Sequence, residues 1–242
     1  MKHTQVALIV GVGPGLGASL GRRFARAGMH VALAARNGAK LDALATECSA
    51  DGHKGRAYSC DTTSEEDVEA LFRNVAAELG EPEVVIYNAG TWARKSILDT
   101  DAAEFERHWR VGCLGGFLVG RAAARVMMRR AEGGGTGGTI LFTGATASLR
   151  GGAQFHSFAA GKFALRALAQ SMARELQPRG IHVAHVVIDG QIGSRSSQPA
   201  EQRGRDDRLD PDAIAEAYYQ THCQPRNAWT LELDLRPWVE KF

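Results

Sequence analysis

Strand-like and helix-like patterns alternate along almost the whole chain. Residues 6–10 (VALIV) and 181–188 (IHVAHVVI) are short, largely apolar runs of the kind found in buried strands. Longer helical patterns separate such runs, and this alternation predicts a mostly parallel sheet with helices on both faces. Further strands are expected at residues 30–35, 54–59, 83–90, 139–143 and 229–235, and helices at about 15–28, 38–50, 65–79, 102–131, 153–177 and 211–222.

One polar segment interrupts this alternation. Residues 191–210 (QIGSRSSQPAEQRGRDDRLD) are polar and charged, with almost no apolar periodicity. The segment is too short to form a second domain, so we expect residues 1–242 to form a single domain. It is either a solvated loop or a flap over a substrate site, and its composition does not distinguish the two.

Composition narrows the class of protein. The chain has 242 residues, of which 44% are hydrophobic, and this suits one compact α/β domain. The net charge of +2 argues against nucleic acid or an anionic membrane as the main partner. The four cysteines are widely spaced, which is typical of reduced thiols and not of a metal site. No run approaches the roughly 18 apolar residues of a membrane span, and we therefore expect a soluble, cytoplasmic protein.

A glycine-rich turn lies between the first strand and the first helix. The sequence GVGPGLG (residues 11–17) places glycines at 11, 15 and 17, with Leu16 between the last two. Such a turn lets the backbone approach a ligand closely, so that a pyrophosphate can rest on the amides of the helix N-terminus. Its position between a strand and a helix favours a dinucleotide site over an ordinary loop.

The end of the second strand indicates which dinucleotide is bound. An NAD site usually has an acidic residue there, on the ribose 2′-hydroxyl, whereas this chain has Arg36. A guanidinium group suits a 2′-phosphate, so we predict NADP as the cofactor ahead of NAD. The alternative is a solvated surface arginine.

Taken together, these features resemble the short-chain dehydrogenase/reductase family over nearly the whole chain. The resemblance implies a Rossmann-type, doubly wound sheet of about seven parallel strands, with the cofactor across their carboxyl ends. It also implies a homodimer or homotetramer. The matching motif residues are Gly11, Gly15 and Gly17 of the fingerprint, Asp61 at the adenine position, and Asn88, Ala89 and Gly90 of the N-A-G element.

The catalytic motif departs from the family pattern. The family uses a tyrosine to exchange a proton with the substrate, and a lysine four residues later lowers its pKa and binds the nicotinamide ribose. Lys162 occupies the lysine position, but Phe158 stands at the tyrosine position. Some enoyl reductases place the tyrosine seven residues before the lysine, and that position is Phe155.

Other positions of the family's site are also changed. The serine position falls on Ala145, although Thr146 and Ser148 are close enough to replace it. The asparagine position falls on Gly112. After the sixth strand, the family's Pro-Gly becomes Asp189 and Gly190, while Ile192 matches the residue that packs on the nicotinamide amide.

These positions yield a set of catalytic candidates. A buried lysine without a charge partner is costly, so we expect Lys162 to bond a cofactor ribose and not to be a solvated helix residue. A desolvated Asp189 could donate a proton, or it could be a turn residue or helix cap. Tyr87 is expected in the core, with a hydroxyl reaching the site as the alternative. Trp92 is either a wall for an apolar substrate or simple packing. The catalytic candidates are Lys162, Thr146, Ser148 and Asp189.

The sequence therefore predicts an NADP(H)-dependent oxidoreductase with a non-standard site. Hydride transfer is mainly cofactor chemistry, so substrates that need little proton assistance fit best, such as an activated alkene, an imine or a small carbonyl. The alternative is a non-catalytic dinucleotide-binding protein, because a fold persists when its chemistry is lost. A structural subunit in a mixed oligomer is a third possibility.

Overall fold

A seven-stranded parallel sheet forms the centre of the molecule. The computed structural model describes residues 4–50, 52–193 and 207–240, so most of the polar segment predicted at 191–210 lies outside the described residues. The strand order is β3-β2-β1-β4-β5-β6-β7, and every neighbouring pair is parallel. The strands are β1 (Val6–Val10), β2 (His30–Ala35), β3 (Gly55–Ser59), β4 (Val84–Tyr87), β5 (Gly138–Thr143), β6 (Ile181–Ile188) and β7 (Glu232–Leu235).

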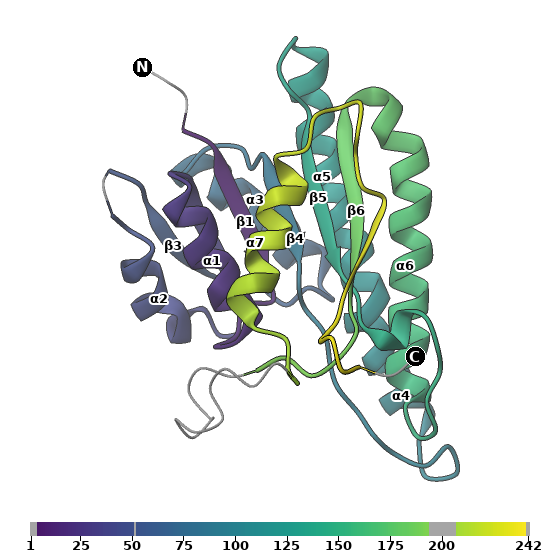
Figure 1. Cartoon of the computed structure of the whole chain (residues 1–242). Coiled ribbons are helices and arrows are strands. Elements are labelled where there is room, and N and C mark those ends of the chain that lie inside the picture. Colours follow the sequence, from purple (N-terminus) through teal and green to yellow (C-terminus); the bar gives the residue numbers. More distant parts are fainter. Residues whose placement is uncertain (1–3, 51, 194–206, 241–242) are drawn as a thin grey trace.

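Helices connect the strands and cover both faces of the sheet. In Figure 1, α1 and α7 lie in front of the sheet, and α3 and α5 lie behind it. The predicted doubly wound α/β fold is thus confirmed. The helices are α1 (Leu16–Arg26), α2 (Asp42–Glu47), α3 (Glu65–Glu78), α4 (Ala102–Trp109), α5 (Gly115–Glu132), α6 (His156–Leu176) and α7 (Pro211–His222).

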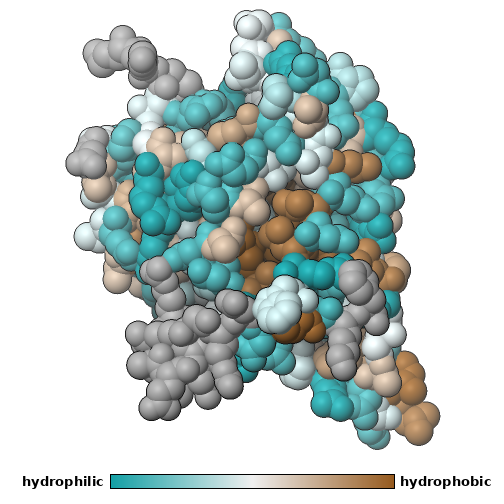
Figure 2. Space-filling model, in the orientation of Figure 1, coloured by the Kyte–Doolittle hydropathy of each residue, from teal (hydrophilic) through white to brown (hydrophobic). Residues whose placement is uncertain are grey.

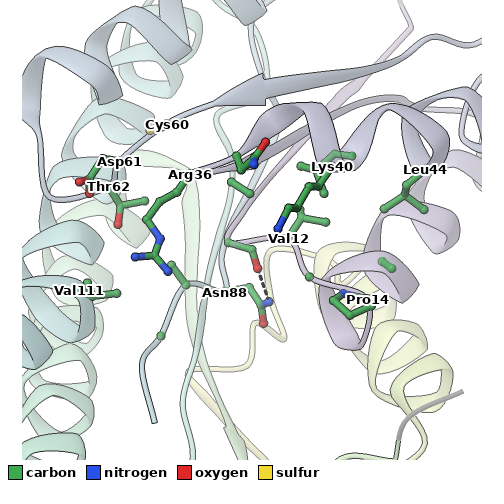
Figure 3. Close-up of a pocket in the computed structure, with 18 of the residues that line it drawn as sticks. Val12, Pro14, Arg36, Lys40, Leu44, Cys60, Asp61, Thr62, Asn88 and Val111 are labelled. Atoms are coloured by element: carbon green, nitrogen blue, oxygen red, sulfur yellow. Dashed lines mark hydrogen bonds between the residues drawn. The ribbon is translucent and has the colours of Figure 1, made fainter. Parts of the chain in front are cut away.

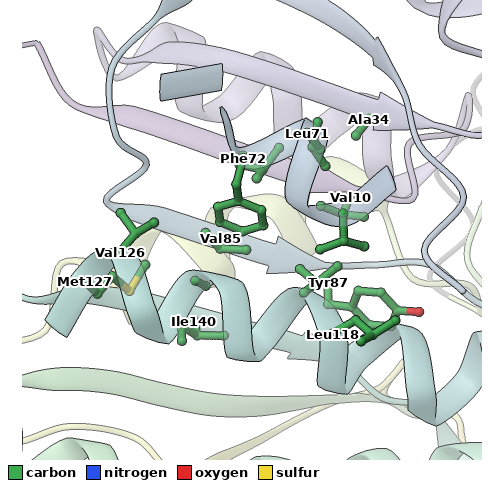
Figure 4. Close-up of a cluster of buried hydrophobic side chains, with 14 of the residues drawn as sticks. Val10, Ala34, Leu71, Phe72, Val85, Tyr87, Leu118, Val126, Met127 and Ile140 are labelled. Atoms are coloured by element: carbon green, nitrogen blue, oxygen red, sulfur yellow. The ribbon is translucent and has the colours of Figure 1, made fainter. Parts of the chain in front are cut away.

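Two hydrophobic clusters hold these layers together, one on each face of the sheet. One cluster joins the sheet to α3, α5 and α6, and the other joins it to α1, α2 and α7. Figure 4 shows part of the first cluster, in which Leu118 of α5 lies beside Tyr87 of β4 and Val126 of α5 lies on the side of Val85. Burial on both faces explains why β1, β4 and β6 are continuously buried rather than alternating.

The long helix predicted at 102–131 contains an irregular turn. Residues Arg110–Leu114 form a π-helical turn between α4 and α5. The Tyr87 hydroxyl donates to the Val111 carbonyl oxygen at 2.5 Å, which satisfies a backbone group within that turn. Gly112 packs directly on α6, because a Cβ built there would lie 3.0 Å from the Gly161 Cα. The buried Tyr87 hydroxyl is thus bonded to the backbone of the π-helical turn.

The helical segment from α4 to α5 is also long and apolar enough to cross a membrane by length and composition. Half of its apolar window is buried inside the protein. The segment packs on the sheet and on α3 and α6, as a core helix does.

The strand order determines at which point of the sheet edge a ligand can bind. β1 and β4 are neighbours at the centre, and the chain winds outward from them in opposite directions. The loops that leave the carboxyl ends of these two strands therefore diverge to opposite faces of the sheet. In open parallel sheets this reversal of strand order leaves a crevice in which ligands bind.

Candidate functional site

A cleft of about 810 Å³ opens at this reversal point. Its walls come from the loops after β1, β2, β3 and β4, with Val111 of the π-helical turn on one side (Figure 3). Six of the predicted cofactor residues line the cleft: Gly11, Arg36, Asp61, Asn88, Ala89 and Gly90. The other predicted cofactor residues, Gly15, Leu16, Gly17, Lys162 and Ile192, are absent from its lining.

The glycines of the first turn divide into two kinds. Gly11 and Gly17 are tightly packed, because an added Cβ would lie 2.3 Å from the Ala89 nitrogen and 2.8 Å from the Val12 Cα, respectively. Gly11 also has a φ of +92°, which favours glycine. Gly13 and Gly15 instead face open space, with nothing within 4 Å of an added Cβ. The turn is thus closed at Gly11 and Gly17 and open at Gly13 and Gly15, of which Gly13 lines the cleft.

The start of α1 is suited to an anion. Gly15 caps the helix without a side-chain hydrogen bond, and the first turn contains no acidic residue. Leu16, the first helical residue, is buried in the core. The unbonded amides of a helix N-terminus attract negative charge, and pyrophosphate groups bind at such ends.

The loops after β1 and β4 are tied to each other. The Asn88 side chain donates from Nδ2 to the Gly11 carbonyl oxygen at 2.9 Å, as the dashed line in Figure 3 marks. The Asn88 backbone amide donates to the Val10 carbonyl oxygen at 2.8 Å. These bonds fix the floor of the cleft, so Asn88 acts as a structural support for the cofactor site.

Two cations lie at the β2 end of the cleft. Arg36 follows β2 directly, and Lys40 comes from the 3₁₀ turn Gly38–Leu41. Figure 3 shows both side chains reaching from the same edge toward the open space. Sequence reasoning missed Lys40, although its position one turn after Arg36 was a signal for it. Paired cations of this kind suit a phosphate.

Asp61 lies beside Arg36, at the start of the loop after β3 (Figure 3). Its Oδ1 accepts hydrogen bonds from the Thr63 amide and the Thr63 hydroxyl, both at 2.9 Å. The Thr63 amide bond is the largest cause that lowers the pKa of Asp61, so the carboxylate is ionised at neutral pH. A fixed acceptor at this place agrees with the predicted contact to an adenine.

Lys162 is a buried cation beside the other end of the cleft. The residue is only 5% exposed, and its Nζ donates to the Thr143 carbonyl oxygen at 2.7 Å. Burial lowers the pKa of Lys162 to about 8. A Cβ added to Gly90 would lie 3.5 Å from this Nζ, which places the ammonium group directly behind the N-A-G turn. No acidic residue pairs with it in the part of the chain that the structure describes.

Phe158, four residues before Lys162, adds no polar group to the site. The Nζ of Lys162 lies 6.0 Å from the centre of the Phe158 ring. Phe155, at the alternative tyrosine position, instead packs edge-on against Trp92, with ring centres 5.8 Å apart. Trp92 is 70% exposed, so it forms part of the outer rim beside α6.

The asparagine position is filled by backbone. Because Gly112 and Gly161 touch where the π-helical turn crosses α6, an asparagine side chain there would collide with the other helix. The absence of the family's amide is therefore built into the helix packing.

Thr146 and Asp189 meet at the carboxyl ends of β5 and β6. The Thr146 hydroxyl donates to Asp189 Oδ1 at 2.6 Å, and Arg236 Nη2 lies 3.3 Å from Oδ2. Arg150 Nη2 lies 4.0 Å from Oδ1. Through these contacts the Asp189 side chain ties three segments of the chain together.

The remaining candidates, Ser148 and Ile192, contact residues of neighbouring turns. Ser148 is fully buried, and its Oγ accepts the Ala145 amide at 3.1 Å within a short 3₁₀ turn. Ile192 forms an isolated bridge with Leu209 beside the segment that is not described. Neither residue makes a contact with Lys162 that the structure records.

A second buried base lies close to Lys162. A Cβ added to Gly144 would lie 2.4 Å from His185 Nε2, so the imidazole packs edge-on against that glycine. Burial lowers the pKa of His185 to about 4, with a smaller contribution from Lys162. His185 is therefore neutral at physiological pH and adds no charge to the site.

The structure also joins two residues that sequence reasoning did not connect. Thr91 lines the cleft directly after the N-A-G turn, and its Oγ1 lies 2.6 Å from Nδ1 of His108 on α4. Their separation along the chain left no local signal for this pair.

The buried ammonium group of Lys162 should make the stability of the protein depend on pH. Folding lowers the pKa of Lys162 from 10.5 to about 8, so the wild type gains stability as pH rises through that interval. Lys162→Met removes this dependence, and the stability of the wild type relative to the variant should rise by about 3 kcal/mol between pH 7 and about pH 10.5. Urea unfolding at several pH values measures the difference, with Lys54→Met at an exposed lysine as the control. A pH-independent difference would contradict the buried position of the ammonium.

Comparisons with known proteins agree with this geometry. A family model described as short chain dehydrogenase matches residues 5–202. A short-chain dehydrogenase structure from Rhodopseudomonas palustris is 40% identical, with a TM-score of 0.82 and coverage of 97% of this chain and 99% of that chain.

Two further solved structures contain nicotinamide cofactors. A metagenomic short-chain oxidoreductase in complex with NADP is 26% identical, with a TM-score of 0.81 and coverage of 97% of this chain and 98% of that chain. A 3-ketoacyl-(acyl-carrier-protein) reductase from Brucella melitensis complexed with NADH is 25% identical, with a TM-score of 0.84 and coverage of 98% of both chains. The chain therefore belongs to the short-chain dehydrogenase/reductase family.

Proposed function

We propose that this protein is an NADP(H)-dependent oxidoreductase whose site lacks the usual tyrosine acid. The observation that carries the proposal is the combination of an open, glycine-lined cleft with the buried Lys162 ammonium at one end of it. The substrate class that we propose is a small carbonyl, an activated alkene or an imine, because these need little proton assistance.

The described residues fit a bound dinucleotide. The open side of Gly13 and Gly15 leaves room for the pyrophosphate at the start of α1. Arg36 and Lys40 would hold a 2′-phosphate, and Asp61 would accept from the adenine. When bound, NADP(H) supplies the hydride chemistry, and the protein orients it.

Lys162 has two tasks in this proposal. Its ammonium group would donate to the nicotinamide ribose, as its place behind Gly90 supports. With a pKa near 8, it is charged at neutral pH yet gives up a proton more readily than an exposed lysine. We therefore assign proton donation to Lys162, while Phe158 supplies an apolar wall beside the ammonium group.

Thr146 is the hydroxyl that we assign to orient the substrate. Its bond to Asp189 fixes the oxygen, and Arg236 holds the carboxylate in turn. Asp189 would then be a positioning residue instead of the proton donor. Ser148 supports the same loop from inside.

A non-catalytic dinucleotide-binding protein is the second candidate function. The observation in its favour is that Phe158, Ala145 and Gly112 stand at the tyrosine, serine and asparagine positions together. Such a protein would retain the cleft and its cations without turnover.

We also propose that the protein assembles as a homodimer or homotetramer. Three aromatic side chains of α4 and α5, Phe105, Trp109 and Phe117, are 38–40% exposed and available to a second copy. Figure 2 shows further hydrophobic surface at the tip of the loop before α4, where Ile97 and Leu98 are 67% and 91% exposed. Sedimentation velocity at micromolar concentration should give a dimer or tetramer, and a monomer would contradict the proposal.

Turnover tests the proposed function directly. We expect the purified protein to bind NADPH and to oxidise it with at least one compound from a panel of ketones, enones and imines, followed by nicotinamide absorbance. Phe158→Tyr restores a phenol four residues before Lys162 and should add or increase ketone reduction. Tight NADPH binding without turnover in the wild type would favour the non-catalytic candidate.

Cofactor choice is tested by Arg36→Ala. Loss of the guanidinium should weaken NADPH binding by about 10- to 100-fold, because a charge-assisted phosphate contact contributes roughly 1–3 kcal/mol. NADH binding should change by less than about twofold, since it lacks the phosphate. Calorimetry with both cofactors measures this, and Arg56→Ala on the exposed face of β3 is the control. Equal losses for both cofactors would contradict the NADP assignment.

A further inference from the structure

Thr91 lies at the end of the cleft where Lys162 is found. It is the residue after Gly90, whose Cα faces the Lys162 ammonium, and it lines the cleft. The cations that would bind the 2′-phosphate belong to the loop after β2 and not to this one. A hydroxyl on this wall is therefore near the reacting end of a bound dinucleotide.

The Thr91 hydroxyl is bonded to a buried imidazole. Its Oγ1 lies 2.6 Å from Nδ1 of His108, a short hydrogen bond between a hydroxyl and a titratable base. His108 is in the last turn of α4 and is only 7% exposed. The Thr91–His108 pair, as we call these two residues, thus leads from the cleft into the layer between α4 and α6.

The same helix crossing brings this pair close to Lys162. The His108 carbonyl oxygen would be 3.4 Å from a Cβ at Gly161, the residue before Lys162. Gly112, four residues after His108, contacts the same Gly161 and leaves no room for a side chain. The helical segment thus packs on α6 through glycine, and the His108 imidazole lies one turn before that contact.

The chemistry of the proposed function needs such a connection. Lys162 is only 5% exposed, so a proton that it donates is replaced from groups on the adjacent cleft wall and the water held between them. A threonine hydroxyl can accept one proton while it donates another, and an imidazole can receive a proton at one nitrogen and release one at the other. Phe158 can do neither.

We propose that the Thr91–His108 pair is a proton relay between the Lys162 end of the cleft and the surface. This inference rests on the proposed oxidoreductase function. In reduction, the Lys162 ammonium gives a proton to the substrate and becomes a neutral amine. The amine takes the Thr91 hydroxyl proton through cleft water, Thr91 takes the Nδ1 proton of the His108 imidazolium, and solvent returns a proton to the imidazole. Oxidation runs through the same bonds in reverse.

The charges around His108 set the direction of its pH dependence. Burial is the largest cause that lowers its pKa, Arg107 lowers it further, and Glu104 raises it. Glu104 is itself paired with Lys95. Because burial holds the pKa of His108 below its usual range, the imidazolium forms only in acid, so reduction should accelerate as pH falls into that range.

Two variants of the pair and one matched control test the relay. Thr91→Val keeps the shape of the side chain and removes the hydroxyl, and His108→Gln removes the titration. Thr91→Ser is the conservative rescue. The control is His156→Gln, since His156 Nε2 is bonded to Thr100 Oγ1 at 3.0 Å in a similar pair that does not line the cleft.

Three measurements read the outcome. Nitrogen-15 NMR of the imidazoles in the cofactor-free protein should show a changed tautomer or pKa of His108 in Thr91→Val, with recovery in Thr91→Ser. Fluorescence titration should give NADPH affinities within about twofold of the wild type in every variant. With a substrate from the panel, Thr91→Val and His108→Gln should lower the reduction rate about tenfold or more and remove its acid limb, whereas His156→Gln should keep both.

The relay and the proposed function fail in different ways. Turnover with an unmoved pH profile in Thr91→Val and His108→Gln would overturn the relay alone. An unchanged His108 signal in Thr91→Val would do the same without any substrate. Absence of turnover in the wild type, despite NADPH binding, would overturn the proposed function and the relay with it.

Discussion

The buried ammonium group of Lys162 is the constraint on which the site depends. A cation that is removed from water carries a large desolvation cost, and here one backbone carbonyl, that of Thr143, is the bond that offsets it. A protein that needed only packing would place an apolar side chain there. The position is understandable when a hydroxyl-rich ligand completes the surroundings of the ammonium, because each hydroxyl is an additional acceptor.

The parallel sheet decides where that ligand can lie. β1 and β4 run side by side and send their loops to opposite faces, so the cleft opens where their carboxyl ends meet. Gly11 and Asn88 lock the two loops together, and the open glycines then present backbone amides to the space between them. The fold thus prepares the cofactor half of the site independently of the chemical half.

Much of this arrangement could be predicted from the sequence, because local patterns report on local structure. The apolar runs predict all seven strands, and the glycine spacing together with Arg36 predicts the cleft that the structure contains. The π-helical turn could not be predicted, since it depends on the hydroxyl of Tyr87 reaching Val111 from another element. The contacts of Asp189 with Thr146 and Arg236 likewise join segments that are distant in the chain.

For the part of the site around Lys162, the sequence predicts which of the family's side chains are missing and not which residues replace them. Phe158 and Gly112 mark what is missing, but a sequence does not reveal which polar group moves into the vacated neighbourhood. The pairing of Thr91 with His108 joins the loop after β4 to α4, and these two residues are distant in the chain. Lys40 was missed for a simpler reason, because a lysine on an exposed turn is usually just solvated.

A crystal structure with NADP bound tests the central claim most directly. The account predicts the nicotinamide ribose within hydrogen-bond distance of Lys162 Nζ, the pyrophosphate at the start of α1 and the 2′-phosphate beside Arg36. An empty cleft at saturating NADP, or a cofactor whose ribose lies away from Lys162, would contradict it.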